Sequence, residues 1–441
     1  MISKLLNFFV NFMQKYLPDP FTIAWLITLF VLIIGSISGE RTTLELINNW
    51  GSGFFGILPF AMQMTLVVVT GYALAAAPIV QRFLKRIAAI PKTPAQLILF
   101  ISVVSMVLYY LNWGLGLIAG GILAREAAKL HPKVDFRLLV TAAFSGIIIT
   151  HGGLSASIPL LINTKGHFLE AQIGLVPLSQ TLFHPQTIFI TVTLAIVIPL
   201  ILVLMMPKEK DTVVADPRLL HDEAELEEES QQVKTLSEKL DTHPLFSAAL
   251  VIMGALYIGQ YFYGGGSLNI NILIFIFLTL GVCAHGTLIK YSRSTVKGAA
   301  SSAGIILQFP FYAGILGIME SSGLVQHISD LLLQFATYDS FELYSYLSSL
   351  VISVFVPSAG GHWVVQAPIM LPAAEALGVE PWKVAMGVAW GESIWNIVCP
   401  FWALPLLAIA KIKIKDLIGF SVLLFLVGNV VAITGILLFP H

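Results

Sequence analysis

The sequence predicts an all-α protein that crosses a membrane several times, and three observations support this fold class. Hydrophobic residues make up 57% of the 441 residues, and charged residues make up only 11%. Mean hydropathy is +0.86, and this composition is too apolar for a soluble domain. Apolar stretches of roughly 20 residues, the length that an α-helix needs to cross a bilayer, recur along the chain.

The apolar segments fall into two halves, 21–206 and 244–441, joined by a polar stretch over 207–243 that holds 11 of the 25 acidic residues. We expect this stretch to be a cytoplasmic linker. Residues 1–20 predict an interfacial amphipathic helix. Uninterrupted apolar segments cover 21–38, 54–79, 186–206, 244–263, 267–286, 298–320 and 415–438, and segments broken by small or helix-breaking residues cover 95–124, 138–162, 341–374 and 382–410.

Lys and Arg in the short loops predict orientation, because cytoplasmic loops carry an excess of these residues. Basic loops on both sides of 95–124 predict a re-entrant hairpin entered from the cytoplasm. A loop with acidic residues and no Lys or Arg before 341–374 predicts a hairpin entered from outside. The same rule places the N-terminus inside and the C-terminus outside. The loop residues are Arg82, Lys85, Arg86, Lys92, Arg125, Lys129, Lys133, Arg137, Lys290, Arg293, Lys297, Asp330, Asp339, Glu342, Lys411, Lys413 and Lys415.

The two halves also match weakly in sequence, since Asn112 aligns with Pro357 and Gly146 with Gly391 at the same interval. Two matching halves of opposite orientation form an inverted repeat, which is typical of secondary transporters with a site at the repeat interface. The predicted fold is therefore an inverted-repeat secondary transporter, an all-α polytopic membrane protein with two re-entrant hairpins and two interrupted transmembrane helices.

The four breaks are the candidate substrate site, because irregular backbone inside a bilayer must be buried in protein or line a wet cavity. Helix N-termini exposed there suit an anion. No Lys or Arg lies near the middle of any broken segment. Backbone N–H groups, serine hydroxyls, asparagine side chains or a histidine would therefore hold the anion. The alternative is that the small residues only allow close helix packing. The candidates are Asn112, Trp113, Gly114, His151, Gly152, Gly153, Ser155, Ser157, Ser358, Gly360, Gly361, His362 and Asn396.

Glu392, with Ser393 beside it, is the candidate for binding a coupling ion, because an ionisable residue inside a membrane segment is costly and is often functional. A structural carboxyl bonded to the backbone or to Asn396 is the alternative. For His151 and His362 the alternative is an ordinary buried histidine. Tryptophans gather at the breaks as well, where some could wall an apolar pocket. They are Trp113, Trp363, Trp390, Trp395 and Trp402.

Five ordered motifs resemble the bacterial short-chain fatty acid transporter family over essentially the whole chain. They occupy residues 17–20, 112–116, 308–314, 357–363 and 400–405. The resemblance implies uptake of acetoacetate and butyrate across the bacterial cytoplasmic membrane, with no catalysis. Members of the wider ion transporter superfamily have inverted repeats, and several are dimers with an elevator movement. The resemblance therefore implies a homodimer and elevator-type alternating access.

Importing a monoanion against a negative-inside potential costs about 2.3 kcal/mol per 100 mV, so we expect symport with H⁺ or Na⁺ and no other cofactor.

A transporter of dicarboxylates or other small organic anions is the nearest alternative. An intramembrane hydrolase using Ser155 and His151 lacks the usual nucleophile motif, and a channel would not need paired broken helices. Cys283 and Cys399 do not suggest a disulfide framework. The absence of a basic patch argues against nucleic acid as a partner.

Overall fold

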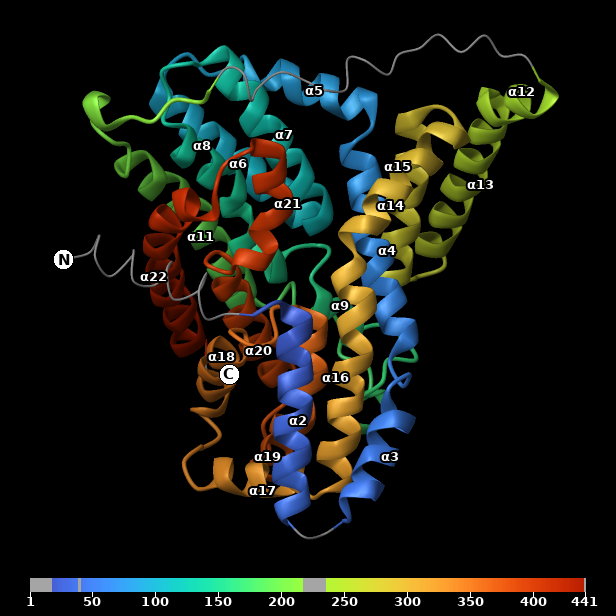
Figure 1. The fold of residues 1–441 in the computed structure, drawn as a ribbon, viewed down its shortest axis with the longest axis vertical. Coiled ribbons are helices and arrows are strands. Elements are labelled where there is room, and N and C mark those ends of the chain that lie inside the picture. Colours follow the sequence, from blue (N-terminus) through green and yellow to red (C-terminus); the bar gives the residue numbers. More distant parts are fainter. Residues whose placement is uncertain (1–17, 39–40, 217–234, 440–441) are drawn as a thin grey trace.

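The computed structural model describes residues 18–38, 41–216 and 235–439, and within them all regular elements are helices (Figure 1). Eight described segments are long and apolar enough to cross a membrane, and a ninth is a pair of helices bent by 41° at a short break. The predicted all-α polytopic fold is therefore confirmed. Most of the predicted interfacial helix, and residues 217–234 of the linker, lie outside the described residues.

The first half contains the hairpin α6–α7 and a helix that is interrupted between η1 and α9. Its elements are α2 (Pro20–Ser38), α3 (Thr43–Gly53), α4 (Leu58–Ala75), α5 (Pro78–Ala88), α6 (Pro94–Leu111), α7 (Trp113–Leu130), α8 (Phe136–Phe144), the 3₁₀ helix η1 (Ser145–Gly152), α9 (Ser157–Ile162), α10 (Glu170–Ile173), α11 (Pro185–Leu204) and η2 (Glu209–Asp211).

The second half repeats this order with the hairpin α18–α19 and the bent pair α20–α21. Its elements are α12 (Leu236–Thr242), α13 (Pro244–Tyr263), α14 (Ile270–His285), α15 (Leu288–Ser301), α16 (Ala303–Ser321), α17 (Leu324–Leu333), α18 (Phe341–Ile352), α19 (Ala359–Ala376), α20 (Pro381–Asn396), α21 (Pro400–Ala410) and α22 (Ile414–Leu438).

Polar side chains start several of these helices by accepting hydrogen bonds from backbone N–H groups that have no partner inside the helix. Thr93 and Gln96 form a capping box at the start of α6, where Pro94 also fits the first turn. Asp135 caps α8 and Asn269 caps α14 in the same way. The sequence thus fixes these helix starts locally, before any tertiary contact forms.

The halves exchange helices. In the first half α2 and α3 pack against α16, and in the second half α14 and α15 pack against α4. Figure 1 shows the hairpin α6–α7 in the upper part of the molecule and α18–α19 in the lower part. The broken helices lie between them, since α20 contacts η1 and α9. This arrangement brings the two hairpin tips and both breaks toward the middle of the fold.

Some predicted boundaries need correction. The segment expected to be uninterrupted over 298–320 is divided at Ser302 between α15 and α16. The expected break over 357–363 is also placed too late. The helix α19 begins at Ala359, so Gly360, Gly361 and His362 lie in its first turn. The glycines predict a break at these positions, but tight packing overrides their low helix propensity.

Candidate functional site

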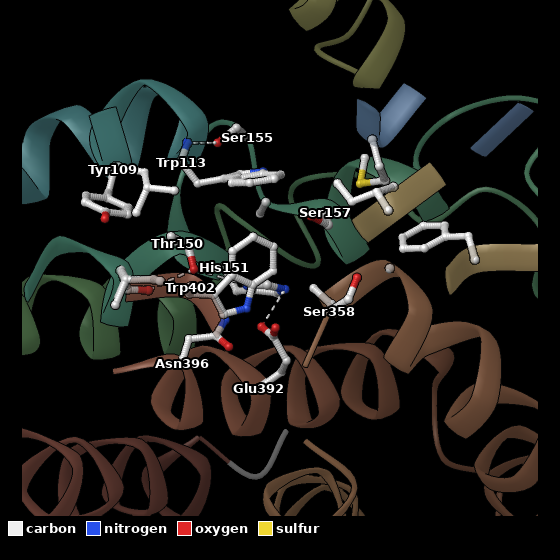
Figure 2. Close-up of a pocket in the computed structure, with 18 residues that line it drawn as sticks. Tyr109, Trp113, Thr150, His151, Ser155, Ser157, Ser358, Glu392, Asn396 and Trp402 are labelled. Atoms are coloured by element: carbon white, nitrogen blue, oxygen red, sulfur yellow. Dashed lines mark hydrogen bonds and ion pairs between the residues drawn. The ribbon is translucent and has the colours of Figure 1, made fainter. Parts of the chain in front are cut away.

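The four breaks meet around one buried cavity of about 30 Å³, which we call the central cavity (Figure 2). Hairpin tips, broken helices and the two long helices α4 and α16 all contribute to its wall. Polar side chains line one part of it, and aromatic and aliphatic side chains line the rest. Its lining consists of Met64, Tyr109, Trp113, Leu117, Ile147, Thr150, His151, Ser155, Ala156, Ser157, Ile305, Phe309, Ser358, Ala359, Gly360, Glu392, Asn396 and Trp402.

The tip of the first hairpin is tied to the break in the helix that follows it. Asn112 ends α6, where its backbone N–H donates to the Leu108 carbonyl. Its side chain caps α7 by accepting a hydrogen bond from the N–H of Leu115 at 2.9 Å. The N–H of Trp113 donates to Oγ of Ser155 at 3.0 Å. The N–H of Leu154 donates to the Tyr110 carbonyl at 2.7 Å. Two of the first three N–H groups of α7 are therefore already occupied by the protein itself.

The tip of the second hairpin is different, because no side chain caps α19 at Ser358. The N–H groups of Ala359 and Gly360 have no hydrogen-bond partner among the described residues, and both residues line the central cavity with Ser358. The first N–H groups of a helix carry partial positive charge and attract anions. The N-terminus of α19 is thus an uncapped helix start in the wall of the cavity, with a partial charge that suits an anion.

An acidic and a basic side chain face each other across the cavity, one from each half. Nε2 of His151 in η1 lies 3.7 Å from Oε2 of Glu392 in α20, and the side chains are 4% and 1% exposed. Neither Glu392 oxygen has a hydrogen-bond partner of ordinary geometry among the described residues, and neither does Nε2 of His151. No Lys or Arg lines the cavity. This pair is therefore the main ionisable element of the site.

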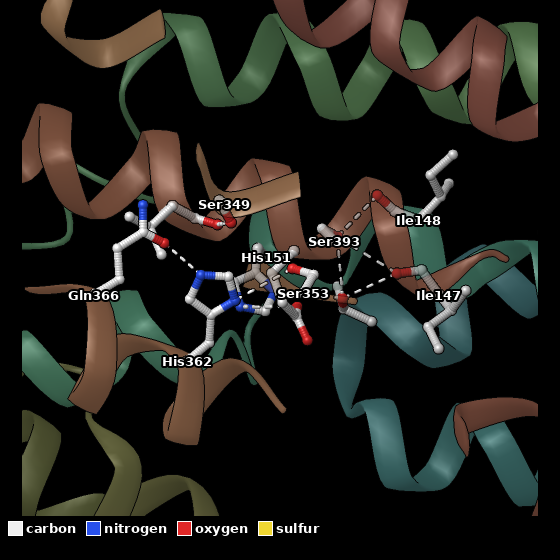
Figure 3. Close-up of polar contacts among 11 residues, drawn as sticks. Ile147, Ile148, His151, Ser349, Ser353, His362, Gln366 and Ser393 are labelled. Carbon is white, nitrogen blue, oxygen red and sulfur yellow. Dashed lines mark hydrogen bonds and ion pairs between the residues drawn. The ribbon is translucent and has the colours of Figure 1, made fainter. Parts of the chain in front are cut away.

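Ser393, the neighbour of Glu392, does not line the cavity and instead joins the two halves. Its Oγ donates to the carbonyl of Ile148 at 3.0 Å and lies 3.2 Å from Oγ1 of Thr150 (Figure 3). These contacts fix α20 against η1, which keeps Glu392 opposite His151. Ser393 thus positions the pair. Its contact with an ion stays a prediction.

His362 also lies outside the lining of the central cavity. Its Nδ1 lies 3.2 Å from Oγ of Ser353, and its Nε2 is hydrogen-bonded to Oε1 of Gln366 (Figure 3). Nε2 of Gln366 donates in turn to Oγ of Ser348 at 2.8 Å. This chain of contacts connects the two arms of the second hairpin, so a satisfied buried histidine describes His362 as the structure shows it.

Three predicted glycines allow neighbouring segments to pack closely against the chain. A Cβ atom at Gly152 would lie 2.0 Å from Oγ1 of Thr191, and one at Gly153 would lie 2.6 Å from the Tyr110 carbonyl. A Cβ at Gly361 would lie 2.4 Å from the Tyr312 ring. Side chains cannot fit at these positions without movement of the neighbours. The glycines hold the breaks in place, which is the close-packing alternative that the sequence left open.

The structure brings seven of the thirteen predicted substrate residues to the central cavity, and these are Trp113, His151, Ser155, Ser157, Ser358, Gly360 and Asn396. Glu392, the predicted coupling-ion residue, lines the same cavity. Gly114 lines a neighbouring cavity instead. Sequence reasoning missed Tyr109 and Thr150. Tyr109 lies three residues before the Asn112 break, and its hydroxyl has no partner among the described residues, so proximity to the break was the available signal.

Comparison with known proteins finds one family along nearly the whole chain, because residues 1–439 match the family described as short chain fatty acid transporter. Two curated relatives are provisionally named short-chain fatty acid transporters. The relative from Escherichia coli K12 is 39% identical over 440 residues, covering 100% of both chains. The relative from Haemophilus influenzae Rd is 40% identical over 428 residues, covering 95% of this chain and 96% of the relative.

A solved structure shares the fold. The crystal structure of the Alcanivorax borkumensis YdaH transporter, described as having an unusual topology, matches with a TM-score of 0.63. The match covers 96% of this chain and 98% of that chain. Because the sequences are only 16% identical, the likeness concerns the fold alone.

Proposed function

Because the chain belongs to the short-chain fatty acid transporter family, we propose that it imports short-chain monocarboxylates such as acetoacetate and butyrate together with a cation. The observation that carries this proposal is the central cavity itself. It combines an open helix N-terminus, a buried pair of ionisable groups and an apolar wall. An acid with one carboxylate and a short acyl chain has the matching chemistry.

The substrate carboxylate binds at the N-terminus of α19. There Ser358 offers its hydroxyl, and Ala359 and Gly360 offer their N–H groups. Ser157, on the opposite side of the cavity, is a further hydroxyl donor (Figure 2). Hydrogen bonds from such donors to a charged oxygen are stronger than neutral ones. The acyl chain then lies against the apolar part of the lining, near Ile305 and Phe309.

Coupling to a cation follows from the charge balance in this cavity. A bound carboxylate next to an ionised Glu392 would place two anions in a buried space with no Lys or Arg in the lining, which is strongly unfavourable. A proton on the Glu392–His151 pair removes this repulsion. A Na⁺ ion beside Glu392 would do the same. Substrate and cation therefore bind together, which is the thermodynamic basis of symport.

A coupled cation removes the cost that the membrane potential places on anion uptake. Uptake of a monoanion alone against a negative-inside potential costs about 2.3 kcal/mol per 100 mV, while one accompanying proton makes the step electroneutral. Two cations would make the potential favour uptake. We propose H⁺ as the coupling ion, because the carboxyl and imidazole groups of the Glu392–His151 pair can both exchange a proton, with Na⁺ as the alternative. Among the described residues no group of three or more His, Cys, Asp or Glu side chains could hold a metal ion.

The proposed transport cycle is an elevator movement in a homodimer of the bacterial inner membrane. The exchange of α2–α3 and α14–α15 between halves supports it, because it gives the long helices α4 and α16 a packed outer layer against which the hairpins can move. The orientation is proposed to be N-terminus inside. The helix α5, with Lys85 and Arg86 in its last turn, lies at the opposite end of the molecule from α17 (Figure 1).

The test is Glu392→Gln, assayed by uptake of labelled butyrate into proteoliposomes under separately imposed H⁺ and Na⁺ gradients. We expect gradient-driven uptake to fall at least tenfold, because the amide cannot gain or lose the coupling proton. Glu342→Gln is the matched control. Glu342 is also a buried carboxylate, but it does not line the central cavity. Its Oε1 accepts a hydrogen bond of 2.8 Å from the Gln186 side chain. Unchanged gradient dependence in Glu392→Gln would refute the coupling role.

The dicarboxylate alternative is less well supported by the cavity. A second carboxylate needs a second group of donors, and the remaining lining is largely apolar, with Leu117, Ile147 and Phe309 among it. Inhibition of labelled butyrate uptake by succinate would favour the dicarboxylate alternative.

A hydrolase is disfavoured by the contacts of its proposed nucleophile. Oγ of Ser155 accepts the Trp113 N–H at 3.0 Å. Among the described residues, Glu392 supplies the only carboxylate within ion-pair distance of His151.

A further inference from the structure

A second cavity lies beside the central one and is much larger, with a volume of about 230 Å³ against about 30 Å³. Four side chains line both cavities, and so they form the partition between them. This partition consists of Trp113, Leu117, Ile305 and Trp402. Trp113 comes from the tip of the first hairpin and Trp402 from the first turn of α21, so two separate broken segments build it.

The two indole rings are the largest part of the partition. Their centroids lie 5.3 Å apart with an interplanar angle of 78°, an edge-to-face contact. Such a contact stabilises aromatic pairs beyond the burial of their area. Trp402 also packs against Phe401, with ring centroids 5.1 Å apart, and Phe401 lines only the second cavity of these two. Figure 2 shows both tryptophans among the residues that line the central cavity, with Trp113 next to Ser155.

The second cavity is suited to an acyl chain. Its wall beyond the partition is mostly aliphatic and aromatic, with Val68, Ile118 and Leu404 as examples. The central cavity is smaller, and Ile305, which the acyl chain contacts there, is itself part of the partition. An acid whose carboxylate is bound at α19 can therefore extend its chain only as far as the tryptophan pair, unless the pair is removed.

We propose that the Trp113–Trp402 pair sets the upper limit of acyl chain length by closing the central cavity against the second one. This inference rests on the proposed function and adds the determinant of its substrate range. It predicts that the second cavity becomes an acyl-chain pocket when either ring is cut back. Medium-chain monocarboxylates then become substrates.

The experiment compares uptake of labelled butyrate, hexanoate and octanoate by proteoliposomes containing wild type or Trp402→Ala. We expect the ratio of octanoate to butyrate kcat/KM to rise at least tenfold, the usual scale on which apolar pockets discriminate between chain lengths. Trp402→Leu is prepared alongside, since it keeps apolar bulk in α21 and serves if the alanine variant does not fold. For the leucine variant a smaller rise in the same direction is expected.

Two further variants make the test specific. Trp395→Ala removes a tryptophan from α20 that lines neither the central nor the second cavity, and it should leave the ratio at the wild-type value. Adding Ile118→Phe to Trp402→Ala refills the second cavity and should restore the preference for butyrate. Ile118 lines the second cavity but not the central one.

The outcomes separate the two proposals. If wild type and the Trp402 variants all transport butyrate with the same chain-length ratio, the tryptophan limit is wrong and the proposed function stands. A rise of similar size in Trp395→Ala would also overturn the limit, because it would show a general loosening. If wild type takes up none of these acids, the proposed function is wrong and this inference falls with it.

Discussion

The two hairpins have the same architecture and different tips. In the first, Asn112 caps α7 and Ser155 accepts the Trp113 N–H, so the protein itself occupies the helix N-terminus. In the second, no side chain caps α19 at Ser358, and its first N–H groups face the central cavity. The comparison teaches that a repeat duplicates geometry, while single side chains decide whether a helix N-terminus is capped by the protein itself. We propose that the first tip acts as a scaffold and the second as the binding element.

The strongest test of the scaffold role is Gly153→Ala. The new Cβ would lie 2.6 Å from the Tyr110 carbonyl, where the first hairpin meets the broken helix. We expect a loss of about 1–3 kcal/mol in stability from this overpacking, seen as a lower melting temperature in detergent. Gly51→Ala is the control, since nothing lies within 4 Å of its Cβ and Ala favours the helix α3. If Gly153→Ala and wild type had equal melting temperatures, the first hairpin would not be held tightly against the broken helix at this position.

Ser358→Ala tests the binding role of the second tip. Losing one hydroxyl bond to a charged carboxylate costs about 1.5 kcal/mol, roughly a tenfold rise in KM for butyrate. The melting temperature should not change, because the hydroxyl caps nothing in the structure. Ser421→Ala in α22 removes another buried hydroxyl away from the cavity and should leave KM unchanged. A fall in stability with KM unchanged would assign Ser358 a structural role instead.

Asn112→Ala should have the smallest effect, and of the opposite kind. Loss of the cap on α7 is expected to cost about 1 kcal/mol of stability, read as a modest fall in melting temperature. KM should stay near the wild-type value, since Asn112 does not line the central cavity. Asn112→Asp, which keeps a capping oxygen, should restore most of the stability. If Asn112→Ala instead raises KM as Ser358→Ala does, the two tips are functionally equivalent and the comparison is wrong.

Much of the fold could be predicted from the sequence, because bilayer length and loop charge act on each segment separately. The break at Asn112 and the bend before Pro400 were visible as residues that interrupt apolar runs. The division at Ser302 was not, since the residues around it are compatible with a continuous helix. Side-chain roles were harder still. His362 and Glu392 look alike in sequence as buried ionisable residues, yet only Glu392 lines the cavity.

The sequence by itself determined most of the membrane-spanning helices, the family and the approximate positions of the four breaks, because composition, helix length and local capping depend on neighbours along the chain. Only the tertiary structure decided which break residues share a cavity. It pairs His151 with Glu392 across the two halves and turns Ser155 toward the Trp113 N–H. The physical reason is that a hydrogen bond or ion pair needs its partners within a few ångströms, and such contacts between residues far apart in the chain form only when the halves pack.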